Sequence, residues 1–210
     1  STEAVRETAG EVLKYKGNIV TTYYYSTSCG KTTTMKAWGT SENESNGYLQ
    51  SVEVKDKKGD YEKSLPWYRW EADIEQNICS TLLAENVKKN IGTVQSLEVT
   101  KTGPGGVALQ IKAVGDKGSI TVDTENKIRK ALGGNGYEIK KQDGTVAQSG
   151  TLLPSAFFKV KKAGNIFKIT GGGYGHGIGM SQNGANEMAK TGKNYQEILQ
   201  MFYPGTTIEK

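Results

Sequence analysis

Short apolar runs separated by glycine-containing turns fill residues 94–170, and they constrain the fold more than any other feature. The runs cover residues 94–101, 107–114, 119–122, 137–141, 145–150, 157–162 and 166–170. Each has the length of a strand, and turns such as Gln142-Asp143-Gly144 are typical of hairpins. The chain holds 27 glycines but only 4 prolines, a balance that suits tight turns and not disorder. We therefore predict a β-rich chain.

Further strands are expected before this region. Residues 11–15 and 19–25 flank Lys16-Gly17-Asn18, which indicates a hairpin. Residues 48–55 and 67–71 also have strand character, and residues 206–209 suit a last edge strand.

Helical spacing of apolar residues appears in a few segments. Residues 73–89 form the longest one, with Asp73 suited to the N-cap and Lys88 and Lys89 to the C-terminus. Residues 2–9 resemble the end of a helix, and a short helix is expected over 124–132. Two more helices are predicted at 181–190 and after Asn194. The predicted class is α+β, with a mostly antiparallel β core on which one mid-chain helix and two C-terminal helices pack.

Charge and hydropathy exclude some functions. The net charge is +5, and no basic block reaches the length of a nucleic-acid-binding arm, so we expect no nucleic-acid partner. No apolar run approaches 18 residues, so any membrane attachment would need a segment outside this chain. The two cysteines, Cys29 and Cys79, leave three alternatives open: free thiols, one disulfide, or a zinc site completed by His176. We expect no metal or other cofactor.

Glycines crowd the only histidine of the chain in residues 171–179, just before a predicted helix. Glycine permits left-handed backbone angles and close approach, and a helix start offers free N–H groups. The segment is a poor phosphate loop because the Gly-Lys-Ser/Thr ending is missing. It is either a binding site that includes His176, or close packing around a structural histidine.

A second candidate segment, residues 25–32, is dense in hydroxyl groups. Cys29 with His176 would form a thiol nucleophile pair, but no signature supports this, and no nucleophile elbow surrounds Ser28. The hydroxyls would line a groove or simply form a polar loop. Aromatic side chains at 38, 67, 68 and 70 suit either sugar stacking or, more commonly, a core. Glu71 is the carboxylate nearest to an apolar setting, although a surface position is its simpler interpretation.

Both ends of the chain resemble the stage II sporulation protein D family, which includes the amidase enhancers. The C-terminal resemblance lies in Gly175-His176-Gly177-Ile178-Gly179-Met180-Ser181-Gln182-Asn183-Gly184-Ala185 and in Phe202-Tyr203-Pro204-Gly205. At the other end it lies in Thr8-x-Gly10-x-Val12-Leu13-x-Tyr15-x-Gly17 and Tyr24-Tyr25-Ser26-Thr27-Ser28-Cys29-Gly30-Lys31-Thr32. We expect one domain over residues 1–210, truncated at its N-terminus, with a β-rich insertion at 92–165.

The resemblance implies an exported cell-envelope protein that cleaves peptidoglycan glycan strands without hydrolysis, leaving a 1,6-anhydro end. It implies a role in sporulation engulfment, a preference for strands stripped of stem peptides, and a cell-wall amidase as partner. One glutamate acts first as acid and then as base. By motif position, the residues expected to bind substrate are Ser26, Ser28, Lys31, Gly175, His176, Gly177, Ser181 and Gln182.

The chain departs from the family pattern because no residue in 1–210 matches the catalytic glutamate, whose motif is expected upstream. The catalytic residue is therefore unknown, and this chain alone is expected to be weakly active or inactive. Three hypotheses follow: a lytic transglycosylase domain, a non-catalytic glycan-binding module that enhances an amidase, and a structural envelope protein.

Overall fold

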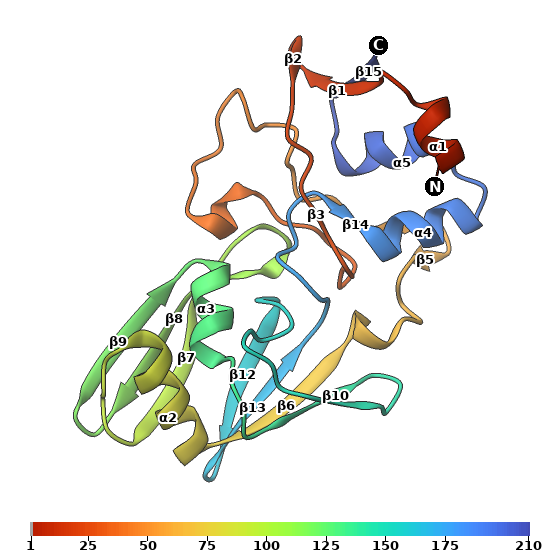
Figure 1. The fold of residues 1–210 in the computed structure, drawn as a ribbon. Coiled ribbons are helices and arrows are strands. Elements are labelled where there is room, and N and C mark those ends of the chain that lie inside the picture. Colours follow the sequence, from red (N-terminus) through yellow and green to blue (C-terminus); the bar gives the residue numbers. More distant parts are fainter. Residues whose placement is uncertain (1) are drawn as a thin grey trace.

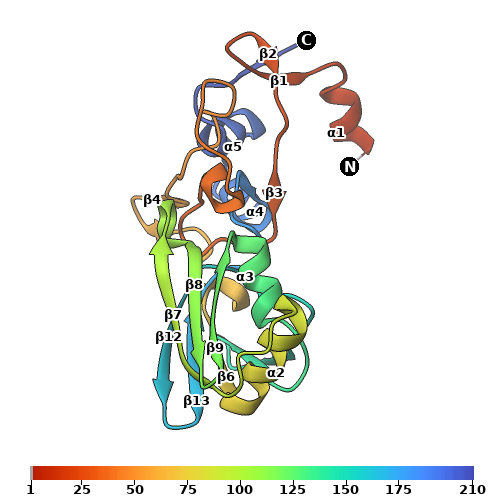
Figure 2. The ribbon, with the colours of Figure 1, turned by 90° about the vertical axis from the view of Figure 1, so that its left-hand side faces the viewer.

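The computed structural model describes residues 2–210, which form two parts joined side by side (Figures 1 and 2). The terminal part holds both chain ends: α1 (Thr2–Glu7), β1 (Val12–Tyr15), β2 (Asn18–Ile19), β3 (Tyr24–Tyr25), β14 (Met180–Ser181), α4 (Gln182–Lys190), α5 (Tyr195–Phe202) and β15 (Thr207–Glu209). The sheet part holds β6 (Trp70–Glu75), α2 (Gln76–Val87), β7 (Val94–Thr102), β8 (Ala108–Gly115), β9 (Gly118–Asp123), α3 (Glu125–Leu132), β10 (Glu138–Lys141), β11 (Val146–Gln148), β12 (Phe158–Ala163) and β13 (Ile166–Gly171).

Short elements connect the two parts. They are the 3-10 helix η1 (Met35–Trp38), the hairpin of β4 (Lys55–Asp56) and β5 (Gly59–Asp60), and the 3-10 helix η2 (Pro66–Tyr68). A third 3-10 turn, η3 (Pro104–Gly106), joins β7 to β8.

Two antiparallel sheets form the sheet part. One has the strand order β11-β10-β6-β13-β12 and the other has the order β7-β8-β9. Burial alternates along β6, where Trp70, Ala72 and Ile74 point inward, as expected for a strand with one face in the core. Helices α2 and α3 contact each other and the three-stranded sheet. The apolar core therefore runs between the two sheets and these helices.

The terminal part is closed by pairing between the two ends of the chain. Strand β1 pairs with β15, with Leu13 opposite Ile208, and also with β2 through a turn at Lys16 and Gly17. Helices α4 and α5 contact each other and β14. Strand β14 in turn pairs with β3, in the one parallel pair among the named strands of residues 2–210.

The structure confirms the α+β class and its mostly antiparallel strands, and it corrects several boundaries. The mid-chain helix begins at Gln76 and not at 73, because Asp73–Glu75 continue the alternating burial of β6. It has a neighbour, α3, so two helices and not one pack in the middle of the chain. The C-terminal helices contact β14 in the terminal part.

Two predicted strands are largely wrong. In residues 48–55 only Lys55 belongs to a named strand, and Glu53 forms an isolated bridge with Lys31. Tyr48 and Leu49 are buried, so their apolar pattern marks core contacts. In residues 67–71, Trp67 and Tyr68 belong to the 3-10 helix η2, and only Trp70 and Glu71 belong to strand β6. In residues 2–210 no helix combines the length and the apolar character needed to cross a bilayer.

Helix α5 offers a test of the terminal part. Asn194 accepts a hydrogen bond from the Glu197 N–H at 2.9 Å, and the Glu197 carboxylate accepts one from the Asn194 N–H at 3.0 Å. We expect Asn194→Ala to lower the free energy of unfolding by about 1 kcal/mol, because it removes this reciprocal cap. Chemical denaturation measures the change. Asn186→Ala, on the exposed side of α4, is the control and should leave stability unchanged or slightly raised. Equal stability of the two variants would contradict the role of the cap.

Candidate functional site

The two segments singled out in the sequence meet in the structure. We name residues 26–34 the hydroxyl loop and residues 171–179 the glycine loop. Thr27 and Tyr174 exchange backbone hydrogen bonds of 3.1 and 2.8 Å, and the Thr33 N–H donates to the Gly177 carbonyl at 2.7 Å. The parallel pairing of β3 with β14 brings the ends of the two loops together. Segments about 150 residues apart in the chain thus form one surface.

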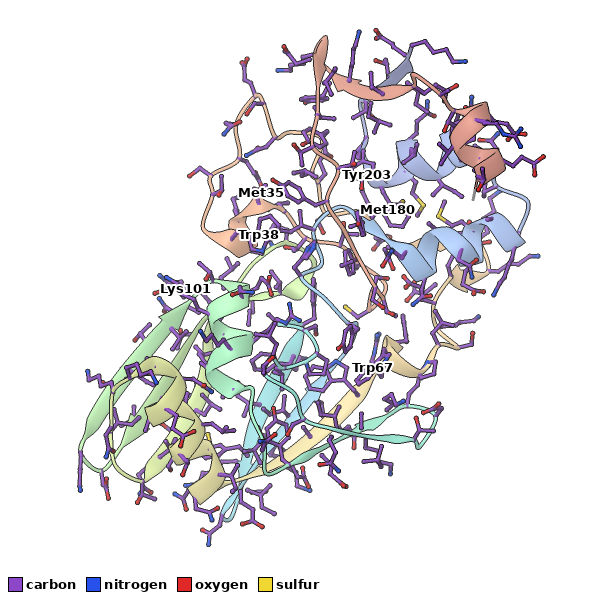
Figure 3. All side chains as sticks on the ribbon, in the orientation of Figure 1. Met35, Trp38, Trp67, Lys101, Met180 and Tyr203 are labelled. Atoms are coloured by element: carbon purple, nitrogen blue, oxygen red, sulfur yellow. The ribbon has the colours of Figure 1, made fainter. Side chains whose placement is uncertain are left out.

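Glycine is required where the two segments lie closest. Gly179 has a φ of +75°, and a Cβ placed there would lie 2.1 Å from the Tyr23 carbonyl oxygen. Any other residue would combine backbone strain with a backbone clash. Beside it, the Met180 N–H donates to the same Tyr23 carbonyl at 3.0 Å, and the Tyr203 hydroxyl does so at 2.7 Å. Figure 3 shows Tyr203 and Met180 together in this region.

A buried carboxylate, Glu62, joins the hydroxyl loop to Ser181, which lies just after the glycine loop. Glu62 lies in the turn before η2, and its side chain is completely covered. It accepts hydrogen bonds from the Ser28 N–H at 2.9 Å, from the Ser28 hydroxyl, and from the Ser181 hydroxyl at 2.7 Å. Ser181 also caps helix α4 by accepting the Gly184 N–H at 3.2 Å. One side chain therefore ties the hydroxyl loop to the start of α4.

The electrostatics of Glu62 suit a positioning role. No Lys, Arg or His in residues 2–210 forms an ion pair with it. Burial raises the pKa of its carboxyl group, and the hydrogen bonds from Ser28 and Ser181 oppose that rise. A raised pKa is also a mark of a proton donor. Because the carboxyl group is covered on all sides, however, it has no route to a substrate oxygen in this structure.

His176 is a fully bonded neutral histidine. Its Nδ1 accepts the Ile178 N–H at 3.1 Å, so Nε2 carries the proton and donates to the Tyr24 carbonyl at 3.0 Å. Burial lowers the pKa of the ring. The ring also packs against Trp38, at 5.1 Å between centroids. The interpretation of His176 as a structural histidine within the glycine loop accounts for all of these contacts.

The remaining predicted substrate-binding residues differ in exposure. Ser28 and Ser181 are buried on Glu62, so their hydroxyls position the loops. Lys31 and Gln182 are exposed, and Ser26 is half-buried. Gly175 is half-buried and Gly177 is buried, and both have positive φ. The structure thus brings all eight residues to one region, but it presents only some of their side chains to solvent.

The aromatic residues divide between core and surface. Trp70 and Tyr68 are buried, which supports the core interpretation for this pair. Trp67 is half-buried and packs on the exposed Tyr174 at 4.8 Å between centroids. Trp38 donates its ring N–H to the buried Glu125 at 3.0 Å. Figure 3 places Trp38 where the two parts of the molecule meet.

Neither thiol is paired in the structure. Cys29 is half-buried in the hydroxyl loop, Cys79 is buried in α2, and both are free. Burial raises the pKa of each thiol, most strongly for Cys79, to about 12, so neither favours the thiolate form at neutral pH. Across residues 2–210, no three side chains of the types His, Cys, Asp and Glu converge as metal ligands would.

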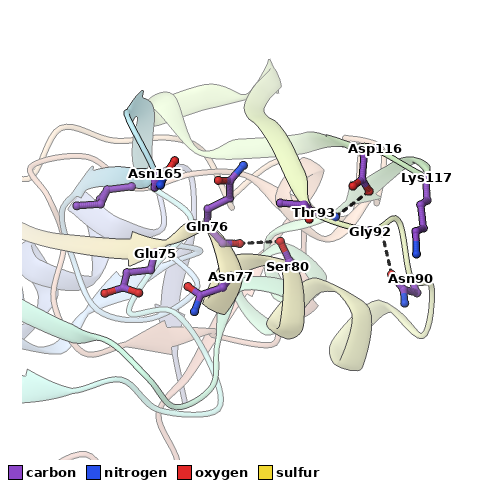
Figure 4. Close-up of a pocket in the computed structure, with 11 residues that line it drawn as sticks. Glu75, Gln76, Asn77, Ser80, Asn90, Gly92, Thr93, Asp116, Lys117 and Asn165 are labelled. Carbon is purple, nitrogen blue, oxygen red and sulfur yellow. Dashed lines mark hydrogen bonds between the residues drawn. The ribbon is translucent and has the colours of Figure 1, made fainter.

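Pockets adjoin the hydroxyl loop on one side. One, of about 560 Å³, is lined by Cys29, Arg69, Glu71 and Lys159 among others, and a second, of about 200 Å³, shares Cys29 and Arg69. Glu71 is thus an exposed wall residue, which agrees with its simpler interpretation. The pocket of about 770 Å³ in Figure 4 lies instead at the start of α2.

Several polar groups of that remote pocket form hydrogen bonds within the protein. The Ser80 hydroxyl donates to the Gln76 carbonyl at 2.6 Å, and Asp116 accepts the Thr93 N–H at 2.9 Å. These bonds close the helix start and the neighbouring turns (Figure 4). We therefore place the candidate site at the two loops.

Sequence reasoning missed Glu62 and Arg69. Glu62 stands in a polar stretch, Asp60-Tyr61-Glu62-Lys63-Ser64, whose composition predicts an exposed turn. Arg69 lies between two aromatic residues in a segment taken for a strand. No local pattern marks either residue, because both act through contacts with distant segments.

The burial of Glu62, which raises the pKa of its carboxyl group, predicts a distinctive pH dependence. Because folding raises its pKa above 4.5, the folded state holds the proton more tightly than the unfolded state. The contribution of Glu62 to the free energy of unfolding therefore falls as pH rises from the ordinary value through the raised one. Glu62→Gln cannot ionise, so the stability of the natural protein relative to this variant should fall across that window. Thermal or urea unfolding across about pH 4–8 measures the difference between the two proteins.

Glu62→Ala is the matched variant. It leaves the Ser28 and Ser181 donors without an acceptor and should cost about 3 kcal/mol at neutral pH. A difference between the natural protein and Glu62→Gln that does not change with pH, or an Ala variant of natural stability, would contradict the role of Glu62.

Comparisons with known proteins agree with the resemblance. A family model described as "Domain of unknown function (DUF8618)" matches residues 39–179. Stage II sporulation protein D of Bacillus subtilis (strain 168) is 31% identical over 209 residues, which cover 100% of this chain and 51% of that protein. Stage II sporulation protein D of Bacillus amyloliquefaciens is 29% identical with the same coverage, 100% and 51%.

A third relative has a different name. The Amidase enhancer of Bacillus subtilis (strain 168) is 28% identical over 237 aligned residues, which cover 98% of this chain and 32% of that protein. The chain thus spans about half the length of the two sporulation proteins and about a third of the enhancer. It belongs to the family described as DUF8618, and its resemblance to stage II sporulation protein D and the amidase enhancers is confirmed.

Proposed function

We propose that this chain forms the glycan-holding part of a lytic transglycosylase that cleaves peptidoglycan strands during sporulation engulfment. The observation that carries the proposal is the union of the hydroxyl loop and the glycine loop into one surface by backbone hydrogen bonds, with Glu62 joining the hydroxyl loop to the start of α4. These loops are the segments that carry the resemblance to stage II sporulation protein D. The match of the whole chain to proteins of that name supports the proposal.

The surface offers groups suited to sugars. Lys31, Ser26 and Gln182 present polar side chains that hydrogen-bond hydroxyl and amide groups. Tyr174, packed on Trp67, presents an exposed aromatic face on which a sugar ring can stack. The proposed ligand is a glycan strand without stem peptides.

The catalytic acid of this proposal is not a residue of the site described above. Glu62 is covered, Glu125 beside Trp38 is buried, and Glu53, Asp60 and Glu71 line the pockets beside the hydroxyl loop. We propose that a glutamate outside these 210 residues supplies the proton and later removes one from the sugar hydroxyl that attacks. The proposed location of the whole protein is the cell envelope, after export.

A second candidate function is a non-catalytic module that binds glycan and enhances a cell-wall amidase. The Amidase enhancer favours it, because its alignment covers 98% of this chain. Both functions use the same surface. They differ in whether the protein that contains this chain makes a product.

Product analysis separates the two functions. We expect the polypeptide that the gene encodes to release 1,6-anhydro-muropeptides from denuded peptidoglycan, whereas residues 1–210 alone retain glycan without cleaving it. Mass spectrometry of the soluble products measures both. Retention of glycan with no anhydro product from either protein would overturn the enzyme proposal and favour the binding module. If neither protein retains glycan, both proposed functions are wrong.

A matched pair of tyrosines tests where the glycan lies. Tyr174 is 43% exposed in the site and Tyr195 is 42% exposed in the terminal part. Tyr174→Ala should weaken glycan binding by about fivefold, because stacking contributes roughly 1 kcal/mol. Tyr195→Ala should leave it unchanged. Calorimetric titration with denuded strands measures both affinities, and equal losses in the two variants would place the ligand elsewhere.

A further inference from the structure

Arg69 stands where two pockets beside the hydroxyl loop adjoin. It follows η2 and is exposed, and it lines both the pocket of about 560 Å³ and the pocket of about 200 Å³. Cys29 and Gly105 are the other residues that the two pockets share. The two-pocket site, as we name it, is therefore bounded by the hydroxyl loop, the η3 turn and the end of β13.

The guanidinium group of Arg69 is held in one orientation. Its Nη1 donates to the Cys29 carbonyl at 3.0 Å and to the Tyr68 carbonyl at 2.7 Å. Its central carbon lies 3.9 Å from the centroid of the Tyr68 ring. A planar group fixed by two hydrogen bonds and a stacking contact loses little further freedom when it binds a ligand.

Gly172 leaves space for the Arg69 side chain in this position. A Cβ at that position would lie 2.5 Å from the Tyr68 carbonyl oxygen, 2.8 Å from the Cys29 Cβ and 3.1 Å from Arg69 Nη1. A side chain there would displace Arg69 or the hydroxyl loop. Gly172 thus leaves room for Arg69, whereas Gly175 packs against Tyr25 of β3.

Arg69 keeps donors that the protein does not use. The two hydrogens of Nη1 are taken, but across residues 2–210 no protein acceptor meets Nε or Nη2, and no carboxylate pairs with the group. The other charged side chains that line the smaller pocket have partners within the protein. Lys31 and Lys55 share Glu53, and Asp60 accepts the Tyr68 hydroxyl. In the larger pocket, Arg69 and the exposed Lys159 face one acid, Glu71.

A fixed guanidinium with free donors suits a carboxylate, which matches its planar fork. Peptidoglycan alternates two N-acetylated sugars, and only the muramic acid carries a lactyl group. That group ends in a free carboxylate wherever no stem peptide is attached. We propose that Arg69 binds the lactyl carboxylate of unsubstituted N-acetylmuramic acid and so sets which sugar of the strand lies at the site. This inference rests on the proposed glycan function and deepens it.

The test uses glycan strands in two chemical forms. One form keeps the free lactyl carboxylates, and in the other the carboxylates are converted to methylamides. Calorimetric titration compares the natural protein with Arg69→Gln, with Arg69→Lys, and with Lys112→Gln, which removes one exposed charge from β8 outside both pockets. Circular dichroism establishes that each variant is folded.

We expect the natural protein to bind the free strands about tenfold more tightly than the amidated ones, as a charge-assisted hydrogen bond implies. Arg69→Gln should lose this preference while its affinity for amidated strands is unchanged. Arg69→Lys should keep part of it, and Lys112→Gln all of it. If Arg69→Gln does not fold, the affinities of the natural protein and of Arg69→Lys for the two strand forms still test the proposal.

The outcomes separate this inference from the proposal on which it rests. Equal binding of both strand forms by the natural protein would overturn the role of Arg69 and leave glycan binding intact. A preference that survives in Arg69→Gln would overturn it as well. Binding of neither form would remove the proposed function, and this inference with it.

Discussion

The hydrogen bonds of Glu62 are the interaction on which the candidate site depends. A carboxylate with no cationic partner is costly to bury, and three donors from Ser28 and Ser181 compensate for that cost. These donors come from the hydroxyl loop and from the start of α4. Where Glu62 keeps its bonds, the hydroxyl loop stays joined to the start of α4. Where it loses them, one hydrogen bond of 3.2 Å, from the Ser28 N–H to the Ser181 hydroxyl, is the remaining direct link between these two residues.

This arrangement explains why the glycines gather in one short segment. The glycine loop runs from the end of β13 in the five-stranded sheet, past the hydroxyl loop, to the parallel pairing with β3. Along that path it crosses side chains and backbone at close range, first at Gly171 against Trp70 and last at Gly179 against the Tyr23 carbonyl. The loop therefore joins the sheet part to the terminal part. His176, bonded at both ring nitrogens, stiffens it midway.

Sequence patterns predicted the fold well where structure is local. The hairpins of residues 94–170 and the Asn194 cap follow from turn glycines and side-chain chemistry that act within a few residues. The start of α2 was misplaced because Asp73 is a good cap but the strand pairing of β6 continues past it. In residues 48–55 apolar spacing reflected burial in an irregular segment. Tertiary contacts determine the start of α2 and the irregular path of residues 48–55, and a short stretch of sequence does not reveal such contacts.

The sequence predicted the two loops of the candidate site but not the long-range contacts that hold them. Glycine density and hydroxyl density marked the two loops, and the structure brings them together. Ser28 and Ser181 look like ligand-binding hydroxyls in sequence, but their partner is Glu62, more than 30 residues from Ser28 and more than 100 from Ser181. Glu62 and Arg69 carry no local signal at all. Long-range partners of polar side chains are what the sequence leaves undetermined.

Hydrogen exchange with and without denuded glycan strands tests the central claim most directly, because it reports where the ligand lies without any substitution. The account predicts added protection in residues 26–33 and 171–182, which form the paired loops. Protection confined to residues 75–93 and 116–117, which line the remote pocket of Figure 4, would contradict it.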